Sequence, residues 1–389
     1  MQSALSPHRP NLRSTSSFPS SLWLTLALAL APAFVSSAHA ADKEPDAEAE
    51  PPKAELEAKG RVFVLAQQWY RTSREGEATV DSEAFSLTVP SARAGIKAKV
   101  TERISLNIEA DFSGGRASIR DGYIQAKAKR WLVRAGRFKM PLSAFTLESP
   151  WTLPRADRGL MDDILSDQML LSGRREGLMG RIEGGGFWDP SLSVGGFQSL
   201  ETLTRVRDLT SVVRAAIEPG KTEIALVGQR RVNLLGQPRA FWAGGVDVTA
   251  DETVAGLGLR AWGEGRIGES WYRQGPLLTG AEQAVAPAKT FFEARAMAAL
   301  RKGGALQGEL YGEVFFSGGL LDPDTNVVQD HLLELSGGFN IGQWQNTRLT
   351  LEIVHVRASQ NFPTAIFQEM ALPIVARQTA AMLQAGAAF

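Results

Sequence analysis

Residues 104–112 read ISLNIEADF and alternate strictly between apolar and polar side chains. This period of two predicts a β-strand with one apolar face and one polar face, because successive side chains of a strand point in opposite directions. A soluble sandwich would turn the apolar face towards its core. A membrane barrel would turn it towards lipid and send Glu109 and Asp111 into a water-filled interior. The rest of the chain decides between these two arrangements.

The first forty residues have the features of a secretory signal peptide. Residues 1–21 carry Arg9 and Arg13 and no acidic residue, and the apolar run LWLTLALALAPAFV follows at 22–35. Ala38-His39-Ala40 then provides the small-x-small pattern that signal peptidase needs. The apolar run is too short to favour a membrane-spanning helix. We therefore expect residues 1–40 to direct export and the mature chain to begin at Ala41.

The composition of the remaining chain narrows the class of protein. The chain contains no cysteine, which excludes a lipid-modified cysteine anchor and a disulfide framework. No later apolar run is as long as a membrane-spanning helix, so a mature protein in a membrane would have to be a closed barrel. Residues 41–59 hold seven acidic residues against three lysines, which predicts an acidic flexible segment. Residues 60–389 are then expected to form one large barrel.

Strand-like alternation recurs along residues 60–389. It is clearest in SARAGIKAKV (91–100), YIQAKAK (123–129), FFEARAMAAL (291–300) and LQGELYGEV (306–314). The pattern predicts an all-β fold, a sixteen-stranded antiparallel transmembrane β-barrel. The predicted strands are 61–71, 83–100, 103–112, 117–129, 131–139, 177–184, 191–199, 209–218, 222–233, 240–250, 253–264, 290–300, 305–316, 331–341, 346–357 and 378–389.

The predicted connections sort by length. Those after even-numbered strands are mostly short turns, whereas those after odd-numbered strands are mostly longer, the longest being 140–176. Short periplasmic turns and long outer loops are typical of an outer-membrane barrel. Trp131, Trp188, Trp344 and Phe389 fall at the predicted periplasmic rim, where aromatic rings favour the membrane interface. A last strand that closes on Phe389 resembles the signal that outer-membrane proteins present to the barrel-assembly machinery.

If the apolar faces meet lipid, the polar faces line a channel. Charges on the wall of a narrow aqueous channel enrich counter-ions, although the alternative is that they are solvated and neutralise one another. Acidic residues interrupt the basic ones, which predicts at most a modest preference for anions. The predicted pore-lining residues are Arg93, Lys97, Lys99, Glu109, Asp111, Lys127, Lys129 and Arg134.

A barrel of sixteen strands is wide enough to leave an aqueous pore, so a further element must narrow it. The segment Met140–Glu176, the third outer loop, contains Leu160, Met161, Ile164 and Leu165. Such an apolar loop would be costly in solvent, so we expect it to fold into the barrel as the constriction. Its charged candidates are Arg155, Asp157, Arg158, Asp162 and Asp163.

Residues 92–183 resemble the phosphate-selective porin O and P family. The resemblance rests on ARAGIKAKV (92–100), the acidic end of ISLNIEADF, RDGYIQAK (120–127) and VRAGRFKMPLS (133–143), the last being the most specific. Arg155-Ala156-Asp157-Arg158 and Arg175-Glu176-Gly177 follow in the order typical of the family. The resemblance implies sixteen strands, a homotrimer, an inward third loop and diffusion of anions. The basic positions here are fewer than in phosphate-selective members.

These patterns favour a porin for small anionic or neutral solutes, in the outer membrane of a Gram-negative cell. A barrel enzyme such as an esterase or lipase would need a base for its nucleophile, and after the signal only His331 and His355 are present, with no Gly-x-Ser-x-Gly elbow. A structural barrel without an open pore is the other alternative. The sequence predicts no cofactor, no metal site and no nucleic-acid partner; the expected partners are lipid, further copies of the chain and the assembly machinery.

Overall fold

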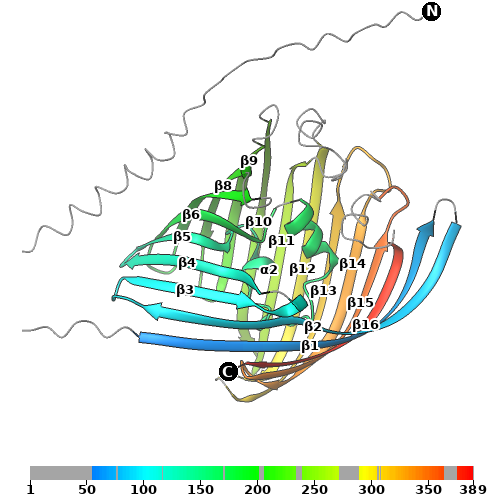
Figure 1. Cartoon of the computed structure of the whole chain (residues 1–389), viewed down its shortest axis with the longest axis horizontal. Helices are drawn as coiled ribbons and strands as arrows, with labels where there is room; N and C mark the ends of the chain where they lie inside the picture. The colour runs from blue at the N-terminus through cyan, green and yellow to red at the C-terminus, as the bar shows by residue number, and fades with distance from the viewer. Residues whose placement is uncertain are drawn as a thin grey trace, which may run out of the picture. The chain divides into compact units, whose positions relative to one another are not determined.

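The computed structural model describes residues 55–388 except 76–77, 116, 170, 201–205, 234–238, 271–288, 305, 307 and 363–374. In the described residues, sixteen antiparallel strands form a closed barrel, in which each strand pairs with its neighbours in sequence and β1 pairs with β16 (Figure 1). The predicted fold class is therefore confirmed. None of the helices in these residues has the length and apolarity needed to cross a membrane.

The strands of the first half are β1 (Glu55–Glu75), β2 (Ala78–Lys99), β3 (Ile104–Asp111), β4 (Ser118–Ala128), β5 (Trp131–Lys139), β6 (Arg174–Glu183), β7 (Ser191–Leu200) and β8 (Val206–Ile217). Those of the second half are β9 (Thr222–Asn233), β10 (Arg239–Val254), β11 (Leu257–Ser270), β12 (Lys289–Gly303), β13 (Leu310–Asp322), β14 (Leu332–Gln343), β15 (Thr347–Ala358) and β16 (Val375–Ala388). The helices are η1 (Ser113–Gly115), α2 (Ala144–Leu147), α3 (Leu160–Asp163) and η2 (Ile164–Gln168).

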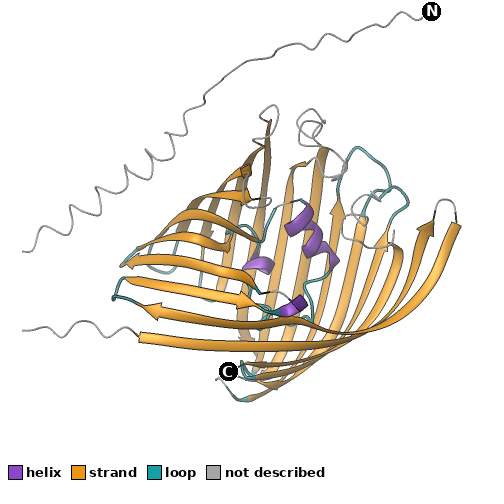
Figure 2. Cartoon of the chain, in the orientation of Figure 1, coloured by secondary structure: helices purple, strands orange, loops and turns teal. Residues whose placement is uncertain are grey.

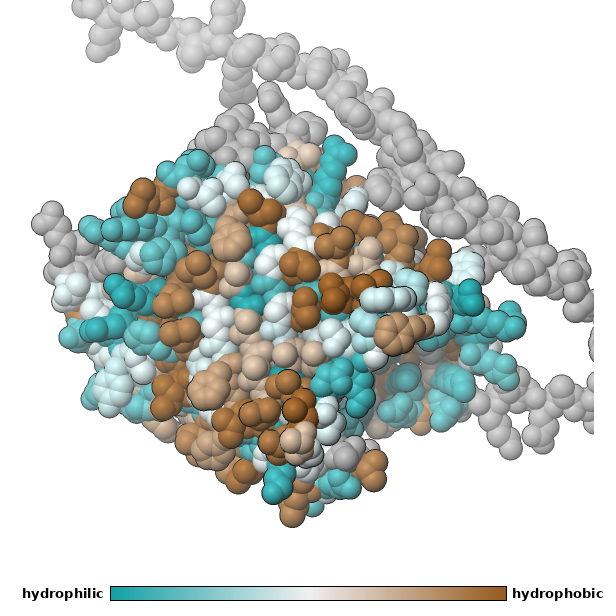
Figure 3. All heavy atoms as spheres, turned by 180° about the vertical axis from the view of Figure 1, so that it is seen from behind, coloured by the Kyte–Doolittle hydropathy of each residue, from teal (hydrophilic) through white to brown (hydrophobic). Residues whose placement is uncertain are grey.

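The stretch ISLNIEADF turns its apolar side chains outwards. Ile108 and Phe112 are 47% and 51% exposed, whereas Glu109 and Asp111 are 3% and 2% exposed. A water-soluble sheet packed on a core would show the opposite pattern. Seen from behind, brown and pale residues cover the middle of the molecule's surface, and strongly hydrophilic residues gather towards its edges (Figure 3). The outer surface is thus apolar, and the inner face of the sheet carries buried charged side chains as well as apolar ones.

The hairpin of β1 and β2 is longer than predicted. The two strands pair as far as Glu75 and Ala78, so most of the loop predicted at 72–82 is strand. A cross-strand hydrogen bond from the Thr72 hydroxyl to Asp81, at 2.7 Å, lies within that segment. β1 also begins at Glu55, inside the segment that was expected to be flexible. This outer part of the hairpin extends beyond the apolar band of the barrel and consists mainly of polar residues. Apolar and polar side chains therefore alternate less clearly there.

Two predicted turns are displaced along the chain. The turn predicted at Asp251-Glu252 is part of β10, and the reversal occurs at Ala255-Gly256, where φ is 52° and 77°. Two residues with positive φ form the tight hairpin that matches the twist of the strands. At the junction of β12 and β13, the glycines at 303, 304 and 308 have φ of 78°, 67° and 82°, values typical of turns. The strand predicted from 305 therefore begins only at Leu310.

The two rims of the barrel differ in their connections. At the rim that contains Trp131, called the short-turn end here, the links between strands have two to seven residues, for example 129–130 and 184–190. The opposite rim, the long-loop end, includes the segment 140–173 between β5 and β6. Trp188 and Trp344 also lie in links at the short-turn end. The rings of Trp344 and Tyr311 meet edge to face with centroids 5.3 Å apart, while Phe389 lies outside the described residues.

The segment 140–173, called loop 3 here, folds into the barrel. Its short helices α2 and α3 lie within the ring of strands (Figure 2). Met161, Ile164 and Leu165 are at most 2% exposed and pack against side chains of the inner wall, including Phe291 and Leu332. The interior of the barrel is therefore a core that one loop shares with the wall, as predicted from its apolar residues.

Candidate functional site

Loop 3 lies against the wall formed by β9 to β16, and arginines of that wall bind its backbone carbonyls. Arg348 donates to the carbonyl oxygens of Leu153 and Arg155, at 2.5 and 3.2 Å. Arg260 donates to the carbonyl oxygen of Thr152, at 2.8 Å. Further donors to loop carbonyls are Arg231, Arg266, Asn340 and Gln384. The backbone carbonyl groups of a loop inside a barrel need hydrogen-bond donors, and these side chains provide them.

Arg155 fixes the middle of loop 3 through two carboxylates. Its guanidinium donates to Glu334 at 2.6 Å and to Glu352 at 2.9 Å. The second oxygens of the same carboxylates accept from backbone N–H groups of the loop, Glu352 from Ala156 at 2.7 Å and Glu334 from Met161 at 3.0 Å. All three charged side chains are buried. Glu334 and Glu352 are therefore loop-binding residues and do not face the open pore.

A second anchor joins loop 3 to β11 and β12. Asp162 accepts from Arg295 at 2.8 Å, and Arg295 also pairs with Glu264. The Ser143 hydroxyl donates to Glu264 at 2.8 Å. Burial by itself would raise the pKa of Asp162, but the charges of Arg295 and Arg158 outweigh it, and the pKa lies below its usual value of 3.8. Asp162 is thus held as a carboxylate beneath the loop.

The opposite wall, from β1 to β6, carries a second network of charges, which are paired mainly within the wall itself. Glu109 accepts from Arg61 at 2.8 and 2.9 Å and lies 3.5 Å from Arg93. Asp111 pairs with Arg93 at 3.0 Å and with Arg120 at 3.1 Å. Each carboxylate therefore holds two guanidinium groups, so the basic side chains are fixed in position and exceed the acidic ones.

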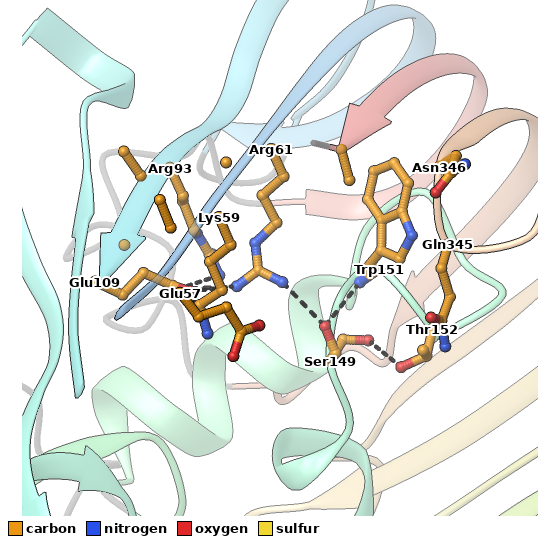
Figure 4. A pocket seen from close by; sticks show the side chains of 15 residues that line it. Glu57, Lys59, Arg61, Arg93, Glu109, Ser149, Trp151, Thr152, Gln345 and Asn346 are labelled. Carbon is orange, nitrogen blue, oxygen red and sulfur yellow. Dashed lines mark hydrogen bonds and ion pairs between the residues drawn. The ribbon is translucent and has the colours of Figure 1, made fainter. Parts of the chain in front are cut away.

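A cavity of about 360 Å³ lies between this wall and loop 3. Eight arginines and three aspartates border it: Arg93, Arg120, Arg137, Arg155, Arg158, Arg174, Arg175, Arg348, Asp157, Asp162 and Asp163. A second cavity of about 430 Å³ adjoins it, and Arg93 borders both. The second cavity is lined by Lys59, Arg61 and Trp151 (Figure 4). The two cavities form a candidate path for solutes past loop 3, and its lining is predominantly basic.

The predicted pore-lining residues fall into three groups. Arg93, Glu109 and Asp111 form the network described above. Arg134 lies over the ring of Tyr123 at 4.4 Å and donates to Gln125 at 2.6 Å, also on the inner wall. The lysines lie at the short-turn end: Lys97, Lys99 and Lys127 are exposed near the ends of their strands, and Lys129 lies in the turn after β4 rather than on the wall.

The predicted residues of loop 3 differ in how they border the 360 Å³ cavity. Arg155 and Asp162 border it but are buried and paired with the wall, whereas Asp157 is exposed. Arg158 donates to the carbonyl oxygens of Thr146 and Glu148, so it braces the loop from within. Asp163 also borders the cavity. No grouping of His, Cys, Asp and Glu in the described residues could hold a metal ion.

Sequence reasoning missed several basic residues of the cavities, among them Arg61, Arg120 and Arg174. Arg61 stands two residues before Phe63 on the inner face of β1, a strand whose alternation was weak. Arg120 lies at a bulge of β4, where the register against β3 shifts, so strict alternation would misplace it. Arg174 was assigned to the loop, but it begins β6 and pairs with Asp121 at 2.9 Å.

Comparison with known proteins identifies one family. The profile of the family described as phosphate-selective porin O and P matches residues 67–186. This match confirms the resemblance noted between residues 92 and 183, and it includes β3 to β5 and all of loop 3. No curated protein matches the sequence.

Solved structures share the barrel at low sequence identity. An anion-selective porin from Comamonas acidovorans is 12% identical, with a TM-score of 0.57 over 87% of this chain and 100% of that one. The outer membrane channel DcaP of Acinetobacter baumannii is 12% identical, with a TM-score of 0.55 over 89% and 100% of the two chains. The trimer form of OmpT, an outer membrane protein of Vibrio cholerae, is 10% identical, with a TM-score of 0.54 over 86% and 99%. At this identity the likeness shows the fold alone.

Proposed function

Because the match of residues 67–186 to the phosphate-selective porin O and P family agrees with a closed sixteen-stranded barrel, we propose that the chain is an outer-membrane porin. It forms a water-filled channel for passive diffusion of small hydrophilic solutes, and it prefers anions. The polar inner wall, the apolar outer face and the inward loop 3 support this proposal. Diffusion through such a channel requires binding that is weak enough to allow release.

The observation that carries the preference for anions is the lining of the 360 Å³ cavity, with eight arginines against three aspartates. Guanidinium groups in a narrow, partly dehydrated passage enrich anions and repel cations. Arg155 of loop 3 is paired with Glu334 and Glu352 of the wall, and Arg348 of the wall binds a carbonyl oxygen of loop 3. The remaining excess is moderate, which supports a general anion preference over strict phosphate selectivity.

The proposal extends to the setting of the protein. Residues 1–40 serve as a signal peptide that is removed before Ala41, and residues from about 60 onwards form the barrel in the outer membrane. Short turns such as 129–130 face the periplasm. The functional unit is a homotrimer that inserts with the help of the barrel-assembly machinery, and the protein is not an enzyme.

Reversal potential in a planar bilayer tests this function. The purified protein is added to one side of a bilayer that separates concentrated from dilute KCl, and single steps of current are recorded. We expect discrete steps of current and a reversal potential whose sign shows that chloride permeates more readily than potassium. Step currents with potassium preference would contradict the anion assignment. No steps at all, from protein with a β-sheet circular dichroism spectrum, would favour a structural barrel instead.

A further inference from the structure

The 430 Å³ cavity at the short-turn side of loop 3 combines an aromatic wall with fixed positive charge (Figure 4). Trp151 of loop 3 borders it on one side, and three basic residues, Lys59, Arg61 and Arg93, border it on the other together with two acidic ones, Glu57 and Glu109. Its volume lies in the range of small-molecule sites, which starts at about 300 Å³. A passage used only by inorganic ions would need no aromatic ring at this position.

Trp151 is held rigidly. Its ring lies 5.0 Å from that of Phe63, tilted by 39°. A Cβ atom at Gly386 would lie 2.6 Å from Phe63 and 3.0 Å from Trp151, so both rings sit in the space that this glycine leaves. The Trp151 carbonyl oxygen accepts from Arg348 at 3.2 Å. The partly exposed ring is therefore a pre-formed surface rather than a mobile side chain.

The Ser149 hydroxyl fixes the charge beside that ring. Its oxygen accepts from Arg61 at 3.1 Å and from the backbone N–H of Trp151 at 3.2 Å. Glu109 holds the other side of the Arg61 guanidinium. The Lys59 ammonium is 4.0 Å from Glu109, and its side chain is 46% exposed. An anion that entered the cavity would thus meet a solvent-facing ammonium and a guanidinium anchored next to an aromatic ring.

We propose that this cavity is a binding subsite for small aromatic carboxylates, whose ring stacks on Trp151 while the carboxylate pairs with Lys59 and Arg61. The inference rests on the proposed porin function, since it names a class of solute for the same path. Stacking of two aromatic rings contributes about 0.5–1.5 kcal/mol beyond burial. Such a site slows the solute without trapping it.

The two hydroxyls that line the cavity, those of Ser149 and Thr152, are already engaged by other protein groups. Ser149 already binds Arg61 and the Trp151 backbone. The Thr152 hydroxyl is engaged by Glu148 and by the Ser149 carbonyl oxygen. A sugar ring would need such groups for its own hydroxyls, because buried polar groups without partners are costly. An aromatic carboxylate needs only the ring face and the positive charge.

Block of chloride current by added anions tests the subsite. Benzoate and acetate carry the same charge and differ in the ring, so each is titrated against the single-channel conductance of the wild-type protein in KCl. We expect benzoate to reach half-block at a concentration about fivefold lower than acetate. In Trp151→Leu the two anions should become equivalent. In Lys59→Gln both anions should need a higher concentration for half-block, and benzoate should still need less than acetate.

The control variant is Trp188→Leu, which removes an exposed tryptophan in the link 184–190, and it should retain the fivefold difference. Equal block by benzoate and acetate in the wild-type channel would overturn the subsite while leaving the porin function intact. Retention of the fivefold difference in Trp151→Leu would also overturn it. Normal step conductance in KCl shows that each variant is folded, and absence of steps in the wild type would instead overturn the porin function.

Discussion

Glu109 lies among three cationic side chains, Lys59, Arg61 and Arg93, at 2.8 to 4.0 Å. It is the carboxylate that most directly lowers the positive potential of the path beside loop 3. A unit charge acting across roughly 7 Å of water contributes about 0.6 kcal/mol to the energy of a permeating ion. The balance of charge at this one residue therefore sets how strongly the channel distinguishes anions from cations.

Replacing Glu109 by Gln should make the channel more selective for anions. The substitution keeps the size of the side chain and removes its charge, so the chloride-to-potassium permeability ratio is expected to rise about threefold. The reversal potential in a KCl gradient measures this ratio. Glu218→Gln, an exposed residue in the link 218–221, is the matched control and should leave the ratio unchanged. A ratio that falls in Glu109→Gln would contradict the role of the network.

The placement of single residues could be predicted where strands alternate regularly. The unbroken alternation of β3 places Glu109 and Asp111 on one face, and the structure has both buried on the inner side of the sheet. Lys129 was assigned to the wall and lies in a turn, since the end of a strand depends on backbone hydrogen bonds that a side-chain pattern does not record. Arg120 was missed because a bulge shifts the register at that point.

At the scale of elements, loop 3 is the part of the protein that the wall holds by charge. Arg155 is buried between Glu334 and Glu352. Removing one member of a buried charge group leaves the others without compensation, at a cost of about 3–5 kcal/mol. Arg155→Ala should therefore release the middle of loop 3 from the wall. The expected result is a larger and noisier single-channel conductance than in the wild type.

The same group of charges offers a variant that should rescue the conductance of Arg155→Ala, and a second ion pair serves as the control. The triple variant Arg155→Met, Glu334→Gln and Glu352→Gln removes all three charges, so its conductance should be steadier than that of Arg155→Ala. Arg181→Ala breaks a partly exposed ion pair to Glu183, at 3.2 Å, and should have little effect. Wild-type noise in Arg155→Ala would mean that loop 3 is held by its apolar contacts alone.

The anchor at Asp162 predicts how loop 3 responds to pH. Burial opposes the charged form of Asp162, but Arg295 and Arg158 overcome it and lower its pKa below the usual 3.8. A carboxyl with a lowered pKa contributes stability above its unfolded pKa and loses it as the pH falls through the folded value. The conductance noise should therefore stay constant from pH 7 to about pH 4 and rise only below that. An onset of noise between pH 5 and 6 would contradict this assignment, and Asp162→Asn should be noisy at pH 7.

The inward fold of loop 3 could be predicted from Met161, Ile164 and Leu165, because apolar side chains in a loop need a core. The side chains that hold it could not. Arg260, Arg348 and Glu352 lie more than a hundred residues along the chain from the loop atoms that they bind. On the sequence they are merely polar positions of alternating strands, and only the closure of the barrel brings them to loop 3.

For the whole molecule, the period of two predicted sixteen strands, and the signal peptide and the sorted connection lengths predicted their closure into a barrel. Turns were less predictable, because an acidic pair such as Asp251-Glu252 resembles a turn but remains strand in a long hairpin. What distinguishes a membrane barrel from a soluble one is whether the apolar or the polar face of the sheet points outwards. Alternation alone is equally compatible with a core or with lipid, and the exposure of Ile108 and burial of Glu109 show that the apolar face of this strand points outwards.

Two neighbouring residues of the opening stretch test this inside-out arrangement. Ile108→Glu places a charge on the outer face, 47% exposed, where insertion into lipid should cost about 2 kcal/mol. Asn107→Glu places the same charge on the inner face, where the residue is 7% exposed but lies opposite Lys97, and should cost less than Ile108→Glu. Urea titration of folding into phospholipid vesicles, followed by tryptophan fluorescence, measures both. The reverse order, with Asn107→Glu harmful and Ile108→Glu tolerated, would mean that water rather than lipid surrounds the barrel, because only the face that enters hydrocarbon excludes an unpaired carboxylate.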